Sequence, residues 1–301
     1  MKKKEKLSFG DILFNICNYC FFGVFTLLCI FPFYYLFINT ISNNDLSNRG
    51  LITFIPKGIH FSNYVEILKL QGLGQAAMVS VGRTLIGTLV TVLASALLGF
   101  LFTKDQMWGR KIWYRFIIIT MYLQAGSIPW YITMMNLHLT NNFLAYIIPA
   151  IVAPFNIIMV KTFVESIPAS LQESAEIDGA GYFTVFTKII LPLIKPILAT
   201  IAIWAAVGQW SSFGDTLFLM TDSKLFTLQF VLYKYLNEAS SLAALVKGSA
   251  GAATNLNVAT MQTATSVRMT VSMVVVLPIL FVYPYFQRYF VKGVMIGAVK
   301  G

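Results

Sequence analysis

The stretch that decides the fold is polar and lies between two long apolar stretches; residues 168–196 read PASLQESAEIDGAGYFTVFTKIILPLIKP. Ser170 is followed three residues later by Glu173, a capping-box pattern in which both side chains pair backbone N–H groups of the first helical turn. Gly179 follows an aspartate, and such a pair tolerates the positive φ of a turn. We therefore predict a short helix that begins near Ser170, a turn at Gly179, and a second helix over 182–190.

Long apolar stretches flank this loop in both directions along the chain. A membrane-spanning helix needs about 20 apolar residues, and six stretches meet this need. The lysine-rich start resembles a signal peptide, but the apolar run behind it is too long and lacks a small-residue cleavage site. We expect an all-α polytopic membrane protein, one transmembrane domain over 1–301 with six transmembrane helices. The expected spans are 12–41, 78–103, 112–135, 143–163, 188–212 and 269–290.

The composition supports a membrane protein and removes one class of partner. The chain is 57% hydrophobic and 11% charged, whereas a soluble domain carries roughly 25% charged residues. Its net charge of +10 would suggest nucleic acid on a soluble chain. In a membrane protein a basic excess first reports topology. No nucleic-acid partner is therefore needed to explain the charge.

The short connections between spans predict the orientation. Lys104, Arg110, Lys111 and Arg115 lie around the turn between the second and third spans, whereas 136–142 carries no lysine or arginine. Short loops rich in basic residues stay in the cytoplasm, so we expect both termini inside. This orientation places the loop 164–187 inside and the longer connections 42–77 and 213–268 outside.

Six residues of the polar loop keep a fixed spacing: Glu173, Ala175, Gly179, Ile189, Leu191 and Pro192. In this order they resemble the EAA loop of the membrane subunits of ABC importers. The middle Ala of the family's Glu-Ala-Ala start is Ser174 here, a small residue in place of another. The stretch 177–180 looks like the carbohydrate-uptake branch of that family. Within that branch, the poly- and oligosaccharide members are similar to this sequence at residues 126–129, 207–210 and 283–301.

This resemblance implies a type I ABC importer permease fold, in a multi-pass protein of the bacterial cytoplasmic membrane. No Gly-x-x-x-x-Gly-Lys-Ser/Thr motif occurs, so the chain lacks a Walker A phosphate cradle and would not be an enzyme itself. ATP and Mg would be bound by a partner ATPase. The implied partners are a second homologous permease subunit in a heterodimer, two ATPase subunits, an external solute-binding protein, a saccharide substrate and membrane lipid.

In the resembled family the loop is a coupling elbow on which the ATPase docks. Glu173 is then the charge expected to meet an arginine of the ATPase, and Gly179 supplies the turn. Phe183 and Phe186 could fill apolar pockets of the ATPase or pack back onto the membrane base. The residues expected to couple to the ATPase are Glu173, Ser174, Ala175, Asp178, Gly179, Ala180, Phe183 and Phe186.

Aromatic and amide side chains near span ends are candidates for the substrate path, because they stack on sugar rings and hydrogen-bond to them. Tryptophan and tyrosine also form ordinary membrane-interface belts. Arg83 and Arg268 lie near the outer ends of two spans, where they could attract an acidic sugar or simply snorkel to the interface. The candidates are Tyr122, Gln124, Trp130, Trp204, Gln209, Trp210, Arg83 and Arg268.

Two other classes of function remain open. An ion-coupled secondary sugar transporter tends to carry carboxylates at mid-membrane, and Asp215 is the only near candidate. A membrane enzyme acting on a lipid-linked sugar would need a convergent acid/base set, which the sequence does not offer. The pair Cys17 and Cys20 has no second pair or histidine nearby, and both histidines are isolated, so no metal site is expected.

Overall fold

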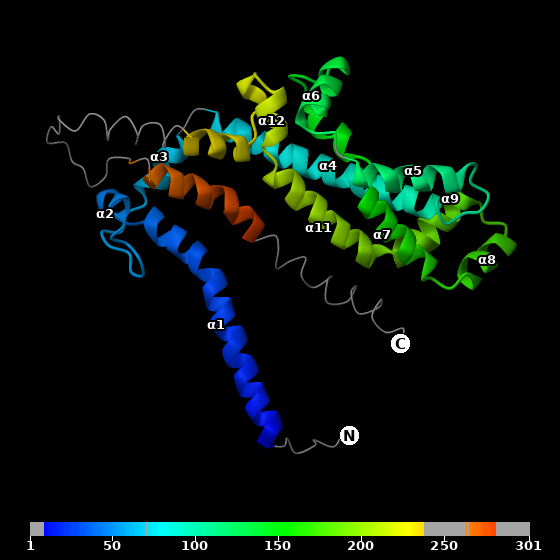
Figure 1. The fold of residues 1–301 in the computed structure, drawn as a ribbon, viewed down its shortest axis with the longest axis horizontal. Coiled ribbons are helices and arrows are strands. Elements are labelled where there is room, and N and C mark those ends of the chain that lie inside the picture. The colour runs from blue at the N-terminus through cyan, green and yellow to red at the C-terminus, as the bar shows by residue number, and fades with distance from the viewer. Residues whose placement is uncertain (1–8, 70–71, 124, 238–262, 264, 281–301) are drawn as a thin grey trace. The chain divides into compact units, whose positions relative to one another are not determined.

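The computed structural model describes residues 9–69, 72–123, 125–237, 263 and 265–280 (Figure 1). Every regular element in these ranges is a helix, which confirms the all-α class for them. The chain divides into two compact units, one of Met1–Lys69 with Tyr235–Val274 and one of Leu70–Lys234 with Val275–Gly301.

The first unit is built on α1 (Phe9–Thr40), followed by α2 (Asn44–Asn48) and α3 (Ser62–Leu68). Most side chains of α1 are apolar and exposed, as expected of a helix surrounded by lipid. Buried amides fold the following loop onto the end of α1. Asn44 and Asn63 exchange two side-chain hydrogen bonds of 3.0 and 2.8 Å, and Asn63 also donates to the carbonyl of Thr40 at 2.9 Å.

The second unit holds the remaining labelled helices. They are α4 (Leu73–Leu101), α5 (Arg110–Tyr122), α6 (Ser127–Asn136), η1 (Phe143–Tyr146), η2 (Ile148–Ala150), α7 (Pro154–Glu165), α8 (Ser170–Ile177), α9 (Tyr182–Thr184), the π-helix η3 (Val185–Ile190), α10 (Leu191–Leu193), α11 (Lys195–Ser211), α12 (Gly214–Leu219) and η4 (Ser223–Leu225). Two more helices cover 228–237 and Thr265–Leu280, and each contains residues of both units.

The helices agree with some of the expected spans and divide others. Among the described residues, α1 and α4 are each long and apolar enough to cross a membrane. The expected fourth span is the bent pair Phe143–Ala150 and Pro154–Glu165, with an angle of 43°. The expected fifth span is the pair Tyr182–Leu193 and Lys195–Ser211, bent by 78°. Both second halves carry proline in their first turn, where its missing N–H costs nothing.

The third expected span is divided into two helices, and the sixth is described only in part. The stretch 112–135 forms two helices, because α5 ends at Tyr122 and α6 begins at Ser127 after Gly126, whose φ of 87° cannot continue an α-helix. Of the stretch 269–290, the residues to Leu280 lie in the helix Thr265–Leu280, and the rest lies outside the described residues.

The core of the second unit forms where α4 packs on α7 and α11. Its buried residues are all apolar and come from α4, α7, η3 and the region of α11: Ala96, Phe100, Val160, Val164, Val185, Phe186, Ile190, Ile194, Ile197 and Ile201. The absence of a side chain at Gly99 lets α7 pack directly against α4, since a Cβ built at Gly99 would lie 2.6 Å from Cβ of Val160. Small residues at such contacts are typical of helices packed in membranes.

We predict that Gly99→Ala destabilises this unit by about 1–3 kcal/mol, because the added methyl overpacks a branched side chain whose Cβ is fixed to the backbone. The change is measured by denaturant unfolding of the detergent-solubilised protein, followed by circular dichroism. Gly74→Ala is the matched control, since it lies in the same helix with nothing within 4 Å. Equal stability of the two variants would contradict the packing described for Gly99.

Candidate functional site

The polar loop forms the helical elbow expected from its sequence. Helix α8 (Ser170–Ile177) ends at a turn in which Gly179 has a φ of 82°, and α9 then starts at Tyr182. The turn and both helices are confirmed. The capping box is wrong, because the residue before the helix is Ala169 and no side chain caps the N-terminus. Ala169 already has helical angles (φ −57°, ψ −33°), so Ser170 is inside the helix and lacks the extended backbone of a capping residue.

The two phenylalanines of the elbow have different environments. Phe186 is buried against Phe100 of α4, with ring centroids 5.3 Å apart, so it packs onto the membrane base. Phe183 is 76% exposed and is available to a partner. Ala175 and Ala180 also pack against the core, and the amide of Ala180 donates to the carbonyl of Ala175 at 2.9 Å. Glu173, Ser174, Asp178 and Gly179 are exposed.

Lys104 contacts α8 from the end of α4. The sequence had indicated only a topological role for this lysine. Lys104 Nζ donates to Gln172 Oε1 at 2.8 Å and lies 3.1 Å from Glu176 Oε1. It also lies 5.2 and 5.4 Å from the ring centroids of Phe100 and Tyr182. Its side chain is only 14% exposed. These contacts of a half-buried charge join α8 to the end of α4.

The acidic face of α8 borders a groove of about 300 Å³ beside this lysine. Glu173 and Glu176 both line the groove, together with Thr103, Asp105 and Glu165 from the ends of α4 and α7. Several carboxylates therefore lie close together in this groove, on the exposed side of the elbow. An arginine or lysine of a partner would find several acceptors there.

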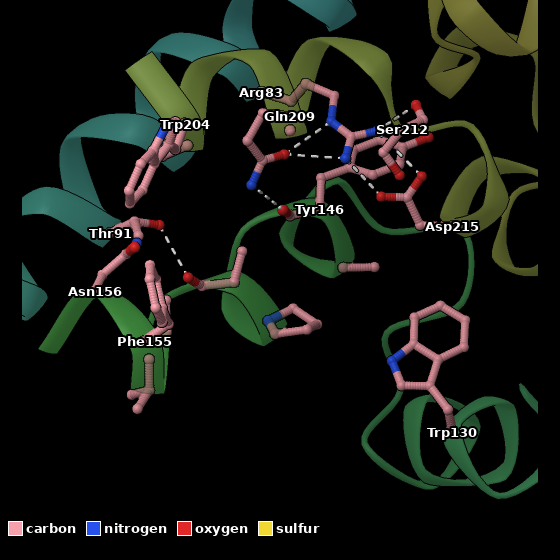
Figure 2. A pocket seen from close by; sticks show the side chains of 17 residues that line it. Arg83, Thr91, Trp130, Tyr146, Phe155, Asn156, Trp204, Gln209, Ser212 and Asp215 are labelled. Carbon is pink, nitrogen blue, oxygen red and sulfur yellow. Dashed lines mark hydrogen bonds and ion pairs between the residues drawn. The ribbon is translucent and has the colours of Figure 1, made fainter. Parts of the chain in front are cut away.

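A larger cavity, of about 570 Å³, lies between α4, α7, α11 and the segment of η1 and η2 (Figure 2). Four of the expected substrate-path residues line it: Arg83, Trp130, Trp204 and Gln209. Three others do not: Tyr122 is 76% exposed, the indole N–H of Trp210 donates to the carbonyl of Val275 at 3.0 Å, and Arg268 is exposed in the first unit. Gln124 lies outside the described residues.

Arg83 is the best-connected polar side chain of the cavity. Its guanidinium pairs with Asp215 at 2.5 and 3.1 Å, and two of its nitrogens donate to Gln209 Oε1 at 3.0 Å. It also lies over the ring of Tyr146, 4.4 Å from the centroid. Arg83 is 2% exposed, so it neither snorkels to the interface nor offers a free charge to an acidic sugar. Its place in the substrate path stays a prediction.

Gln209 links this ion pair to neighbouring backbone. Its Nε2 donates to the carbonyl of Tyr146 at 3.2 Å. The side chain fits only because α4 carries Gly87 opposite, where a Cβ would lie 2.7 Å from that same nitrogen. The Tyr146 hydroxyl in turn donates to the carbonyl of Leu225 at 2.7 Å. The side chains of Arg83, Gln209, Tyr146 and Asp215 at this end of the cavity are therefore all hydrogen-bonded.

The other end of the cavity is aromatic and contains residues that sequence reasoning missed. Phe155 and Trp204 lie with ring centroids 5.7 Å apart at 37°, next to Asn156 (Figure 2). Phe155 and Asn156 follow Pro154 at the start of α7, and a local motif does not reveal that they face α11. Tyr146 and Asp215 were missed as cavity residues for the same reason, since their partners are far away in the sequence.

The comparisons with known proteins agree on one family. The model of the binding-protein-dependent transport system inner membrane component matches residues 5–296. Protein LplC of Bacillus subtilis is 33% identical, over 96% of this chain and 95% of its own length. The polygalacturonan/rhamnogalacturonan transport system permease protein YtcP of Bacillus subtilis is 30% identical, over 96% of this chain and 99% of its own.

A solved structure extends this agreement to the fold. One chain of a bacterial ABC transporter involved in the import of the acidic polysaccharide alginate superimposes with a TM-score of 0.81. The alignment covers 95% of this chain and 100% of that chain, at 26% identity. Because the family model spans almost the whole sequence and the fold agrees with it, this chain belongs to the binding-protein-dependent transport system inner membrane components.

Proposed function

We propose that this chain is one permease subunit of an ATP-driven importer that moves a poly- or oligosaccharide across the cytoplasmic membrane. The observation that carries the proposal is the similarity along nearly the full chain to permeases named for saccharides. They include YtcP and the arabinooligosaccharide permease AraQ of Bacillus subtilis, which is 25% identical over 96% of this chain. The cavity lined by aromatic and amide side chains supports it.

The proposed assembly contains a second homologous permease subunit, two ATPase subunits that bind ATP and Mg, and an external solute-binding protein. Both termini would lie in the cytoplasm, with α8 on the same side as the ATPases. The carboxylates of Glu173 and Glu176 beside the groove support docking of a basic partner there. The secondary-transporter alternative loses its candidate, because the Asp215 carboxylate is held by Arg83. The external loops 42–77 and 213–268 would receive the binding protein.

The function is tested by purifying the tagged chain from its native host and reconstituting what purifies with it. An ATPase and a second permease should be present, and uptake of an oligosaccharide into proteoliposomes should require ATP and the binding protein. Uptake driven by a proton or sodium gradient without ATP would reject the proposal.

In this assembly the contact of Lys104 with α8 would transmit movement of the elbow to α4. We predict that Lys104→Met leaves the complex assembled and hydrolysing ATP but lowers the amount of saccharide imported per ATP about tenfold. Losing hydrogen bonds to a charged group costs about 1.5–3 kcal/mol, which is enough for such a change. Import and phosphate release are measured on the same proteoliposomes.

Lys111→Met is the matched control, because Lys111 is an exposed lysine near the same end of the bundle. An unchanged import-to-hydrolysis ratio in Lys104→Met would show that this lysine does not take part in coupling.

The ion pair at one end of the proposed path is predicted to be structural. Asp215→Asn should destabilise the protein by about 3 kcal/mol, because it leaves a guanidinium that is 2% exposed without its counter-charge. The double variant Arg83→Met/Asp215→Leu should recover most of this loss, since removing both charges leaves none unpaired. Denaturant unfolding in detergent gives the free energies.

The exposed pair of Arg49 and Asp45, with side chains 67% and 29% exposed, serves as the comparison. Asp45→Asn should cost less than about 1 kcal/mol. If Asp215→Asn costs no more than Asp45→Asn, the burial described for Arg83 does not hold in the membrane protein.

A further inference from the structure

Asn156 is a polar side chain that lines the cavity without a hydrogen-bond partner among the described residues. The residue is 9% exposed. By contrast, Gln209 and Arg83 hydrogen-bond to each other and to neighbouring groups, and the Thr91 hydroxyl donates to the carbonyl of Ala150 at 2.9 Å. An amide that lines a cavity without a protein partner can donate and accept hydrogen bonds to a ligand placed there.

An aromatic surface lies directly beside this amide. Phe155 precedes Asn156 on α7, and Trp204 comes from α11; their rings contact each other and remain 50% and 43% exposed. Figure 2 shows all three labelled side chains grouped at the end of the cavity away from Asp215. A pyranose ring has an apolar C–H face and polar hydroxyl edges. An aromatic face next to a free amide complements both parts of such a ring.

The charges of the cavity favour a ring without a carboxylate. Among its described lining residues, the two charged side chains are Arg83 and Asp215, and they neutralise each other. All three guanidinium nitrogens already donate to Gln209, Ser212 or Asp215. A uronate entering the cavity would meet the carboxylate of Asp215 without a free cation to compensate its own charge.

We propose that Asn156, Phe155 and Trp204 form a subsite for a neutral pyranose unit of the transported glycan. Asn156 hydrogen-bonds the ring hydroxyls, and the two aromatic side chains contact the C–H face. The subsite rests on the proposed importer function and specifies it further, because it places substrate contact on this permease subunit and assigns the substrate class. Asn156 is then a residue that determines specificity.

The test uses the intact complex with its binding protein in proteoliposomes. ATP-dependent uptake is measured for the neutral probes maltotetraose, raffinose and xylotetraose and for the acidic probe trigalacturonate. Wild type should import at least one neutral probe and import trigalacturonate at least tenfold less efficiently. For that neutral probe, Asn156→Leu should raise KM about five- to tenfold, and Trp204→Ala should do the same, while Trp204→Phe stays within twofold of wild type.

Asn136→Leu is the control, because it makes the same substitution at an exposed asparagine that does not line the cavity. It should leave KM unchanged. If Asn156→Leu fails to assemble, Trp204→Ala and Trp204→Phe still decide, since the indole is partly exposed and its truncation leaves no buried polar group.

Two results would overturn the subsite while leaving the importer function intact. One is an unchanged KM in both Asn156→Leu and Trp204→Ala, and the other is uptake of trigalacturonate as efficient as that of the neutral probes. Failure of wild type to import any glycan with ATP would instead overturn the proposed function and the subsite with it.

Discussion

The guanidinium of Arg83 donates five hydrogen bonds inside the helical bundle, to Gln209, Ser212 and Asp215. One side chain of α4 thereby fixes the end of α11 and the start of α12. An arginine away from water is stable only when its donors and its charge are both satisfied. The positions of Gln209 and Asp215 are therefore determined by this requirement, and with them one end of the cavity.

Helix α4 connects this ion pair to the elbow. Arg83 lies in its first half, whereas Lys104, which holds Gln172 and Glu176 of α8, follows three residues after its last residue, Leu101. At 1.5 Å per residue, the helix carries the two contacts roughly 30 Å apart. Gly87 and Gly99 let side chains of α11 and α7 lie directly against its backbone. Because packed interiors are barely compressible and transmit strain, this close packing gives a physical route between α8 and the cavity.

Local sequence patterns predicted what depends on local chemistry. The long apolar stretches predicted α1 and α4. The glycine after Asp178 predicted the turn, because a positive φ depends on the single residue that adopts it. The capping box failed for a local reason as well, since the backbone of Ala169 is already helical. The break before α6 was missed because hydropathy averages over the stretch and does not register the φ of Gly126.

The long-range contacts could not be read from any pattern in a single sequence. Lys104 and Glu176 are 72 residues apart, and Arg83 and Asp215 are 132 apart. Their charges could be counted towards topology, but their pairing depends on how α4 packs. Asn156 was missed because an amide in an apolar stretch resembles any other buried polar residue. Its position becomes informative only in the folded chain, where it lines the cavity beside Phe155 and Trp204 without a hydrogen-bond partner among the described residues.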